Sequence, residues 1–181
     1  MELENMKINE GYMTGNIKYK EDIFGNEEGE ITERLKRLSR NILLKYNYNI
    51  SKEVGYNDIG EYHEYKLETI REINSKWEIH PDGSNFHNSC STIIFYLENT
   101  FQQGGGLIIY DKDKKTIKEI INTKSDNGEV KMVLLDGKVP HNMESAHGIG
   151  IRRSYVFQYE NNDEEFTKYK NYLLELKKKN K

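Results

Sequence analysis

Hydrophobic residues recur at three- to four-residue spacing in one segment near the start of the chain. This spacing places side chains on one face of an α-helix, and the residues that follow it are Ile31, Leu35, Leu38, Ile42 and Leu43. A second, weaker helical pattern covers residues 61–73, and a polar helix with a basic end is expected over 166–179. Residues 1–29 are polar and Glu-rich, so we expect irregular structure there, with one strand near 15–19.

From residue 77 onward, the pattern changes to short runs of β-branched and aromatic residues. Such runs are typical of strands, and they lie at 91–97, 107–110, 116–121, 131–135 and 154–159. The glycines at 104–106 and the Asp136–Gly137 pair are turn signals between these runs. Short strands with glycine turns, preceded by helices, predict a mainly β fold: a barrel or sandwich with helices supporting one outer face.

The composition narrows the class of protein. The chain has 181 residues, 35% hydrophobic and 31% charged, which is enough to bury the core of a single domain. A net charge of −3 gives no general attraction to phosphate backbones, so nucleic acid stays open as a partner but is not favoured. Cys90 is the sole cysteine, which excludes an intrachain disulfide and a Cys-based zinc site. The sequence shows no apolar run of membrane-spanning length and no signal peptide, so we expect a cytoplasmic protein without a membrane partner.

Two histidines and one aspartate have a spacing that suits a single metal ion. In an extended segment, residues two apart point to the same side, so His80 and Asp82 can reach one metal while Pro81 points away. His141 follows an apolar strand and a turn, which would return it beside the first pair. Two imidazoles and one carboxylate form the facial triad of non-heme Fe(II) oxygenases, which leaves coordination positions open. The alternative is that the motif arises by chance. The remaining histidines, His63, His87 and His147, are expected to have surface or hydrogen-bonding roles.

A candidate anion site follows the last histidine. Arg152 comes after His141 with ten residues between them, and its guanidinium offers a two-pronged cation for a dicarboxylate such as 2-oxoglutarate. By alternation, Ser154 points the same way as Arg152, whereas Arg153 points outward. Tyr96 lies on a predicted strand and could place its hydroxyl on the same carboxylate. The alternatives are a surface ion pair for Arg152 and simple core packing for Tyr96.

With these motifs in place, residues 77–159 resemble the 2-oxoglutarate/Fe(II)-dependent dioxygenase superfamily, and most of all its prolyl-4-hydroxylase-like branch. The similarity covers less than half of the chain and involves four separate motifs in the order of the family. They are HPD at 80–82, STIIFYLEN at 91–99, QQGGGLIIYD at 102–111 and VPHNMESAHGIGIRRSYVF at 139–157. One departure is Arg152, where many prolyl hydroxylases have lysine.

The resemblance implies a double-stranded β-helix, or jelly roll, within a single domain over 1–181. We expect this domain to comprise an N-terminal helical support region at 1–75, a catalytic jelly-roll core at 76–160 and a C-terminal helix and tail at 161–181. The resemblance also implies that His80, Asp82 and His141 bind Fe(II). Arg152, Tyr96 and Ser154 would bind 2-oxoglutarate as the cosubstrate, and O2 would be the oxidant.

The implied activity is hydroxylation of a C–H bond with release of succinate and CO2. The expected substrate is a side chain of a protein or peptide, with proline as one candidate. One alternative is the same chemistry on a free amino acid or a nucleobase, with hydroxylation or demethylation as the outcome. Another is a non-catalytic β-barrel module that binds a metal. Asn85 and His87 are candidates for substrate contact, and the sequence carries no signal for oligomeric state.

Overall fold

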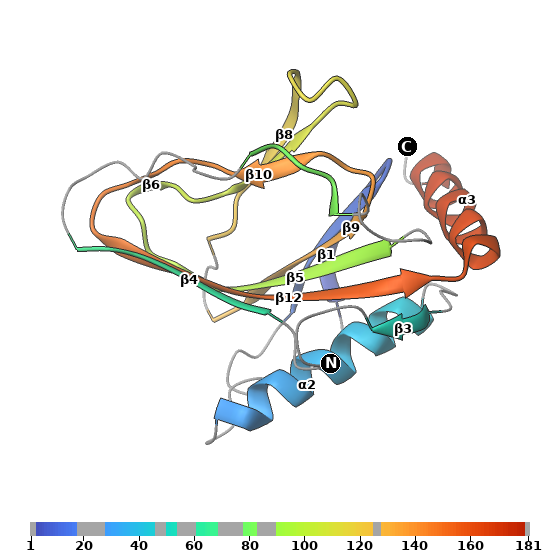
Figure 1. Cartoon of the computed structure of the whole chain (residues 1–181), viewed down its shortest axis with the longest axis horizontal. Helices are drawn as coiled ribbons and strands as arrows, with labels where there is room; N and C mark the ends of the chain where they lie inside the picture. Colours follow the sequence, from blue (N-terminus) through green and yellow to red (C-terminus); the bar gives the residue numbers. More distant parts are fainter. Residues whose placement is uncertain are drawn as a thin grey trace.

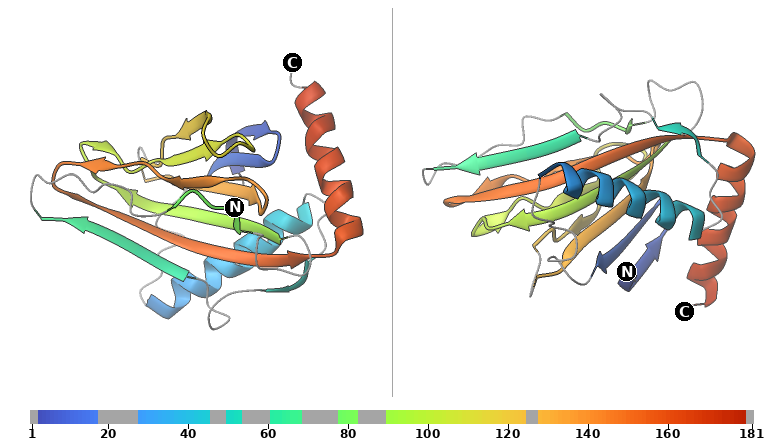
Figure 2. Two further views of the ribbon diagram at one scale, coloured as in Figure 1. Left: turned by 45° about the horizontal axis from the view of Figure 1, so that its top comes forward. Right: turned by 90° about the horizontal axis from the view of Figure 1, so that it is seen from below.

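The computed structural model describes residues 3–17, 28–45, 50–53, 61–68, 78–82, 90–124 and 128–179. These residues form one large antiparallel sheet that faces smaller sheets across the interior, as Figure 1 shows. Helix α2 (Glu28–Lys45) lies against the outer face of the large sheet, on the side away from the small sheets, and helix α3 (Asp163–Lys179) follows the last strand (Figure 2). No helix among the described residues is long and apolar enough to cross a membrane.

Two sets of strands make the barrel. The strand order in the large sheet is β1 (Leu3–Asn9), β2 (Tyr12–Ile17), β9 (Val130–Asp136), β5 (Cys90–Asn99), β12 (Gly150–Asn161) and β3 (Ile50–Glu53). Strand β4 (Glu61–Leu67) also pairs with β12. The facing sheets are β10 (His141–Met143), β7 (Leu107–Tyr110) and β8 (Ile117–Ile121), and the pair β11 (Ala146–His147) with β6 (Gln103–Gly104). This is the predicted mainly β fold, a double-stranded β-helix with supporting helices.

Strand β5 is buried on both faces, which explains its unbroken run of apolar residues. Its odd-numbered side chains, Ile93 and Phe95, pack in a core with Leu35 and Leu43 of α2. Its even-numbered side chains point into the barrel, where Ile94 packs with residues of β7 and β8. Because successive side chains of a strand point to opposite faces, both sides of β5 need hydrophobic residues.

A β-bulge adjusts the pairing of β5 with β12 near the interior. Arg152 lies opposite Asn99, whereas Ser154 lies opposite Tyr96, so β5 carries one extra residue between them. A bulge shifts the alternation by one residue. Tyr96 and Asn99 are therefore both paired with inward-facing residues of β12, although they lie three apart in the sequence.

The N-terminal region differs from the prediction. Residues 61–67 form strand β4 and not a helix, because pairing with β12 overrides the local spacing of Tyr62 and Tyr65, which resembles a helical repeat. Residues 3–17, expected to be mostly irregular, form the antiparallel hairpin β1–β2. The region expected to be mainly helical support thus adds strands to the large sheet beside α2. The remainder of both segments, 18–27 and 69–73, lies outside the described residues, as do Asn85 and His87.

The other elements agree with the predicted pattern. Helices α2 and α3 cover the two segments with helical spacing, and each of the five expected strands is present. Strand β12 is longer than predicted, because its ends are stabilised by pairing with β3 and β4. The Asp136–Gly137 signal is a turn, in which the Val139 amide donates a hydrogen bond to the Asp136 carbonyl at 2.9 Å.

Candidate active site

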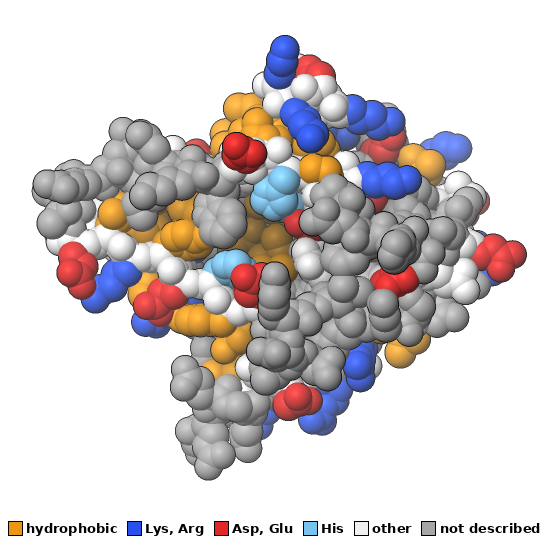
Figure 3. All heavy atoms as spheres, viewed as in Figure 1, with side chains coloured by type: hydrophobic (Ala, Val, Ile, Leu, Met, Phe, Trp, Pro, Cys, Tyr) orange, Lys and Arg blue, Asp and Glu red, His pale blue; other side chains and the backbone are white. Residues whose placement is uncertain are grey.

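The residues predicted to be functional line one cavity of about 480 Å³ between the large sheet and strands β7 and β10. Figure 3 shows a hollow on this side of the molecule, with hydrophobic side chains in its floor and histidines at its rim. Apolar lining comes from Ile94, Leu107 and Val156. The predicted site residues that share the cavity are His80, Asp82, Tyr96, His141, Arg152 and Ser154.

Backbone pairing holds the two histidines together. His80 and His141 form an isolated antiparallel bridge, in which each amide donates to the carbonyl of the other at 3.2 and 3.1 Å. Their ring centres are 4.8 Å apart. A directly paired register brings two side chains to the same face of a sheet. Two backbone hydrogen bonds therefore bring together two histidines that lie 61 positions apart in the sequence. A metal site built from His80, Asp82 and His141 requires this proximity.

Each imidazole is oriented by a backbone carbonyl. The Nδ1 atom of His80 lies 2.8 Å from the carbonyl oxygen of Glu78, and Nδ1 of His141 lies 2.9 Å from that of Val139. A carbonyl only accepts, so both Nδ1 atoms carry the proton and both Nε2 atoms keep a lone pair. The two Nε2 atoms lie 3.5 and 3.7 Å from the carboxylate oxygens of Asp82.

Asp82 completes the cluster and has its own orienting partner. Its Oδ2 atom accepts a hydrogen bond from the Thr92 hydroxyl at 2.6 Å. The side chain of Asp82 is 9% exposed, as is that of His141, whereas that of His80 is 46% exposed. One ligand atom from each of the three residues lies within 4.8 Å of the others. The cluster therefore has a buried side and an open side, and the open side is where a further ligand can enter.

The charges of the cluster suit a cation. Burial alone would raise the pKa of Asp82. Hydrogen bonds with His80 and Thr92, together with electrostatic attraction to His141, hold this pKa below its ordinary value. Burial lowers the pKa of His141, against the attraction of Asp82. The hydrogen bond with Asp82 raises the pKa of His80 despite partial burial. An ionised aspartate beside neutral imidazole is the donor set that divalent iron accepts, so these residues fit the metal that the sequence predicts.

The other end of the cavity holds a buried cation. The Arg152 side chain points inward from β12 and is 6% exposed, and Ser154, which follows on the same face, is 3% exposed. Arg153 points to the opposite face, where it pairs with Glu64 and Glu98. The predicted alternation along this strand is therefore confirmed. No ion pair joins Arg152 to a carboxylate within the part of the chain that the structure describes.

Two buried polar atoms at this end have no hydrogen-bond partner among the described residues: Nε of Arg152 and the hydroxyl of Tyr96. Burial raises the pKa of the Tyr96 phenol, although the charge of Arg152 opposes the rise. This hydroxyl therefore remains a donor. Buried donors without acceptors are costly. An entering carboxylate would satisfy both, so this end of the cavity has the composition of an anion site.

Among the lining residues that sequence reasoning did not identify, Thr92, Tyr65 and Met143 contact the predicted site residues. Thr92 lies on the same face of β5 as Tyr96, so alternation alone could have placed it beside the cavity. Tyr65, whose ring centre is 5.9 Å from the Arg152 guanidinium carbon, was assigned to a helix that does not exist. Met143 accepts a hydrogen bond from Nη1 of Arg152 at 2.9 Å, and nothing in the sequence signals this contact.

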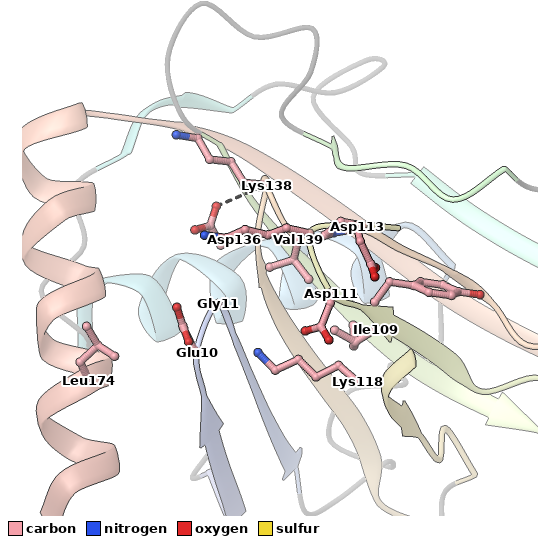
Figure 4. Close-up of a pocket in the computed structure, with 13 residues that line it drawn as sticks. Glu10, Gly11, Ile109, Asp111, Asp113, Lys118, Asp136, Lys138, Val139 and Leu174 are labelled. Atoms are coloured by element: carbon pink, nitrogen blue, oxygen red, sulfur yellow. Dashed lines mark hydrogen bonds between the residues drawn. The ribbon is translucent and has the colours of Figure 1, made fainter. Parts of the chain in front are cut away.

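A second hollow of about 710 Å³ lies between α3, the β1–β2 turn and the β9–β10 turn (Figure 4). Its charged lining includes both signs, with Lys118 and Lys138 near Asp111 and Asp136. It backs onto Val139, whose carbonyl orients His141. Among the described residues, the group able to hold a metal lies in the smaller cavity. We therefore place the candidate active site there.

Comparison with known proteins establishes the fold. The structure is similar to a prolyl hydroxylase from Trichoplax adhaerens, solved in complex with a peptide fragment of the hypoxia inducible factor oxygen degradation domain. The TM-score is 0.56 at 18% identity, over 88% of this chain and 67% of that chain. A prolyl-4-hydroxylase from Pseudomonas putida gives a TM-score of 0.43 at 16% identity, over 87% of this chain and 78% of that chain, and this weaker likeness carries no argument. No protein-family model and no curated protein sequence matches the chain.

The predicted resemblance is thus confirmed at the level of the fold. The chain has the jelly-roll architecture of a prolyl hydroxylase, with a His-Asp-His cluster that lines its cavity.

Proposed function

We propose that this protein is an Fe(II)- and 2-oxoglutarate-dependent dioxygenase that hydroxylates a C–H bond in a protein or peptide side chain. The observation that supports it most is the pairing of two sites in one cavity. A metal-binding cluster with an open side lies at one end. At the other end lies a buried arginine that has no counterion among the described residues, beside a phenol hydroxyl with no hydrogen-bond partner among them. 2-Oxoglutarate carries a metal-chelating keto acid and a distant carboxylate, so it matches both.

The residues would divide the work as follows. His80, Asp82 and His141 would hold Fe(II) through Nε2, a carboxylate oxygen and Nε2. Arg152, with the Tyr96 hydroxyl and Ser154, would bind the far carboxylate of the cosubstrate. Bound Fe(II) and 2-oxoglutarate supply the activation of O2, and the overall reaction gives succinate, CO2 and the hydroxylated product.

The protein's own contribution is rigidity and a dry environment. Backbone carbonyls and the Thr92 hydroxyl fix the ligand side chains, which limits their reorganisation during the reaction. The apolar lining from Ile94, Leu107 and Val156 lowers the local dielectric constant and strengthens the attraction between Arg152 and an anion. The same lining keeps bulk water away from the oxidising centre.

A peptide substrate is the first choice for two reasons. The prolyl hydroxylase with the same fold was solved with a peptide fragment bound. The exposed side of the cluster, marked by the half-exposed His80, leaves room for a chain to approach the metal from outside. Proline is therefore the first residue to test, and a free amino acid or nucleobase would need the same metal and cosubstrate.

The test is a coupled assay on the purified chain with Fe(II), 2-oxoglutarate, ascorbate and a library of proline-containing peptides. We expect Fe(II)-dependent formation of succinate, together with a mass gain of one oxygen on a peptide. Succinate without a modified peptide would redirect the search to small substrates. A protein that binds iron but forms no succinate with any substrate class would contradict the proposed activity and favour a non-catalytic metal module.

A further inference from the structure

Among the described residues, those that contact Arg152 at the anion end of the cavity orient its guanidinium without neutralising its charge. Nη1 of Arg152 donates to Sδ of Met143, and the guanidinium carbon lies 4.9 Å from the ring centre of Tyr96 and 5.9 Å from that of Tyr65. A thioether and two aromatic faces attract a guanidinium, but none of them carries a formal negative charge. The full charge of Arg152 therefore remains available to a carboxylate that enters the cavity.

Met143 is placed so that its sulfur faces the cavity. It lies two residues after His141 on β10, and both side chains point inward because alternate residues of a strand share one face. Met143 is 6% exposed and packs with Phe101 and Ala146. The sulfur thus lies between a hydrophobic cluster and Arg152, on the lining of the cavity that would receive the cosubstrate.

We propose that Met143 is an oxidisable positioning residue: its thioether holds Arg152 ready for the 2-oxoglutarate carboxylate, and conversion of this thioether to a sulfoxide by a peroxide weakens that binding. The proposal rests on the proposed function, since it concerns the affinity of the same site for the same cosubstrate. It adds a modification site to that function and makes cosubstrate affinity sensitive to oxidants.

The chemistry of the modification is a two-electron oxidation of sulfur. A lone pair of Sδ attacks one oxygen of hydrogen peroxide, and the S–O bond forms as the O–O bond breaks. The proton on the attacked oxygen passes to the departing hydroxide, which leaves as water, so that sulfur is oxidised by two electrons and the peroxide is reduced by two. The new sulfoxide oxygen is a much stronger hydrogen-bond acceptor than a thioether. It would bind the Nη1 donor tightly and compete with the carboxylate for Arg152, in addition to taking up space in the cavity.

The other methionines provide internal controls. Among the methionines that the structure describes, Met6 on β1 is 43% exposed and should react with peroxide first, whereas Met13 and Met132 are fully buried in the core beneath α2. The substitution Met6→Leu removes the exposed thioether without touching the cavity. Met143→Leu keeps a similar volume at the site but removes both the hydrogen-bond acceptor and the oxidisable sulfur.

The experiment treats metal-free protein with hydrogen peroxide, removes the peroxide, adds Mn(II) as a redox-inert substitute for iron, and titrates 2-oxoglutarate by calorimetry. Mass spectrometry of peptides reports whether Met143 has gained oxygen. Before treatment, we expect Met143→Leu to bind 2-oxoglutarate about 2- to 10-fold more weakly than wild type, as loss of one hydrogen bond predicts, with unchanged Mn(II) affinity. After treatment, the 2-oxoglutarate affinity of wild type and of Met6→Leu should fall by about tenfold or more. The affinity of Met143→Leu should not fall any further.

Three results would overturn the inference while leaving the proposed function standing. In the first, Met143→Leu binds 2-oxoglutarate as tightly as wild type does. In the second, peroxide treatment leaves Met143 unoxidised. In the third, Met143 is oxidised but the affinity for 2-oxoglutarate is not reduced. If untreated wild type binds Mn(II) but not 2-oxoglutarate, the proposed function fails and the inference fails with it.

Discussion

The two ends of the cavity are built in opposite ways. At the metal end, each candidate ligand has a second, fixed partner: a backbone carbonyl for His80 and for His141, and a threonine hydroxyl for Asp82. At the anion end, Arg152 rests on a thioether and aromatic rings, and its Nε atom and the Tyr96 hydroxyl have no partner among the described residues. At the metal end, the polar groups that orient the ligands have hydrogen-bond partners within the protein. At the anion end, polar groups without partners among the described residues are available to a ligand.

This difference follows from what each end must do. A metal site gains affinity when its ligands are fixed before binding, because little conformational freedom is then lost. An anion site gains affinity when its cation has no internal counterion to displace. Substitutions at the two ends should therefore affect different measured quantities, and the following predictions are ordered by the size of the expected effect.

The largest effect is expected at the carboxylate shared by the cluster. Asp82→Ala removes a candidate ligand itself, so metal affinity should fall by more than the roughly 10- to 100-fold that the loss of a supporting residue costs. The measurement is metal content after dialysis, together with succinate formation. Asp111→Ala, which changes an aspartate outside this cavity, serves as the matched control. Stoichiometric iron in Asp82→Ala would show that the ligand set is wrong.

The second effect should leave the metal end intact. Arg152→Ala removes the buried cation, and we expect the concentration of 2-oxoglutarate needed for half-maximal activity to rise by roughly 30-fold or more, or about 2 kcal/mol. Arg152→Lys keeps the charge but loses the planar guanidinium, so its requirement for 2-oxoglutarate should lie between those of wild type and Arg152→Ala. Metal affinity should stay at the wild-type value in both variants. An unchanged requirement for 2-oxoglutarate would move the cosubstrate site elsewhere.

Thr92 tests whether the support of the metal end matters. Thr92→Val removes the hydroxyl that donates to Asp82 but keeps the branched shape, and we expect metal affinity to fall by about 10- to 100-fold. Thr92→Ser retains the hydroxyl and should bind metal almost as wild type does. Equal metal affinity in the valine and serine variants would mean that this hydrogen bond has no role in orienting Asp82.

A smaller change is expected from the phenol at the anion end. Tyr96→Phe keeps the ring beside Arg152 and removes the unpartnered hydroxyl, so 2-oxoglutarate affinity should fall by about 2- to 10-fold. Calorimetry on the metal-loaded protein measures this loss. Since burial of an unsatisfied hydroxyl is unfavourable, the free protein should become no less stable to heat. A large loss of thermal stability with unchanged affinity would instead indicate a purely structural role for this tyrosine.

The smallest difference concerns protonation within the metal end. The pKa of His80 is raised by Asp82, and that of His141 is lowered by burial. As the pH of metal-free protein falls through the neutral range, His80 should take up its proton first and His141 at lower pH. Because protons compete with metal for both nitrogens, metal affinity should decline as His80 titrates. Histidine NMR signals followed against pH test this order, and the reverse order would contradict the burial assigned to His141.

The parts of the site that alternation defines were predictable from the sequence. Arg152 and Ser154 point inward and Arg153 outward because a strand has a period of two, and this requires no knowledge of the partner strand. The hydrophobic run of β5 and the helical spacing of α2 are equally local signals. The His-x-Asp motif was informative for the same reason.

Features that depend on pairing between distant segments were not predictable. The local sequence of β4 has helical spacing, and its pairing with β12 makes it a strand. Strand β10 has three residues and forms by pairing with β7. The bulge that pairs Tyr96 with Ser154 and Asn99 with Arg152 is likewise a property of the pairing between β5 and β12. The contact of Met143 with Arg152 joins two strands, and methionine has no characteristic sequence pattern that would reveal it.

The most direct test of the central claim is an anaerobic titration of the Fe(II)-loaded protein with 2-oxoglutarate, followed by visible absorption. Chelation of iron by the keto acid produces a charge-transfer band, so the titration reports both ends of the cavity at once. We predict a saturable band that is absent in Asp82→Ala and requires far more 2-oxoglutarate in Arg152→Ala. Iron bound at the cluster without any such band would contradict the account.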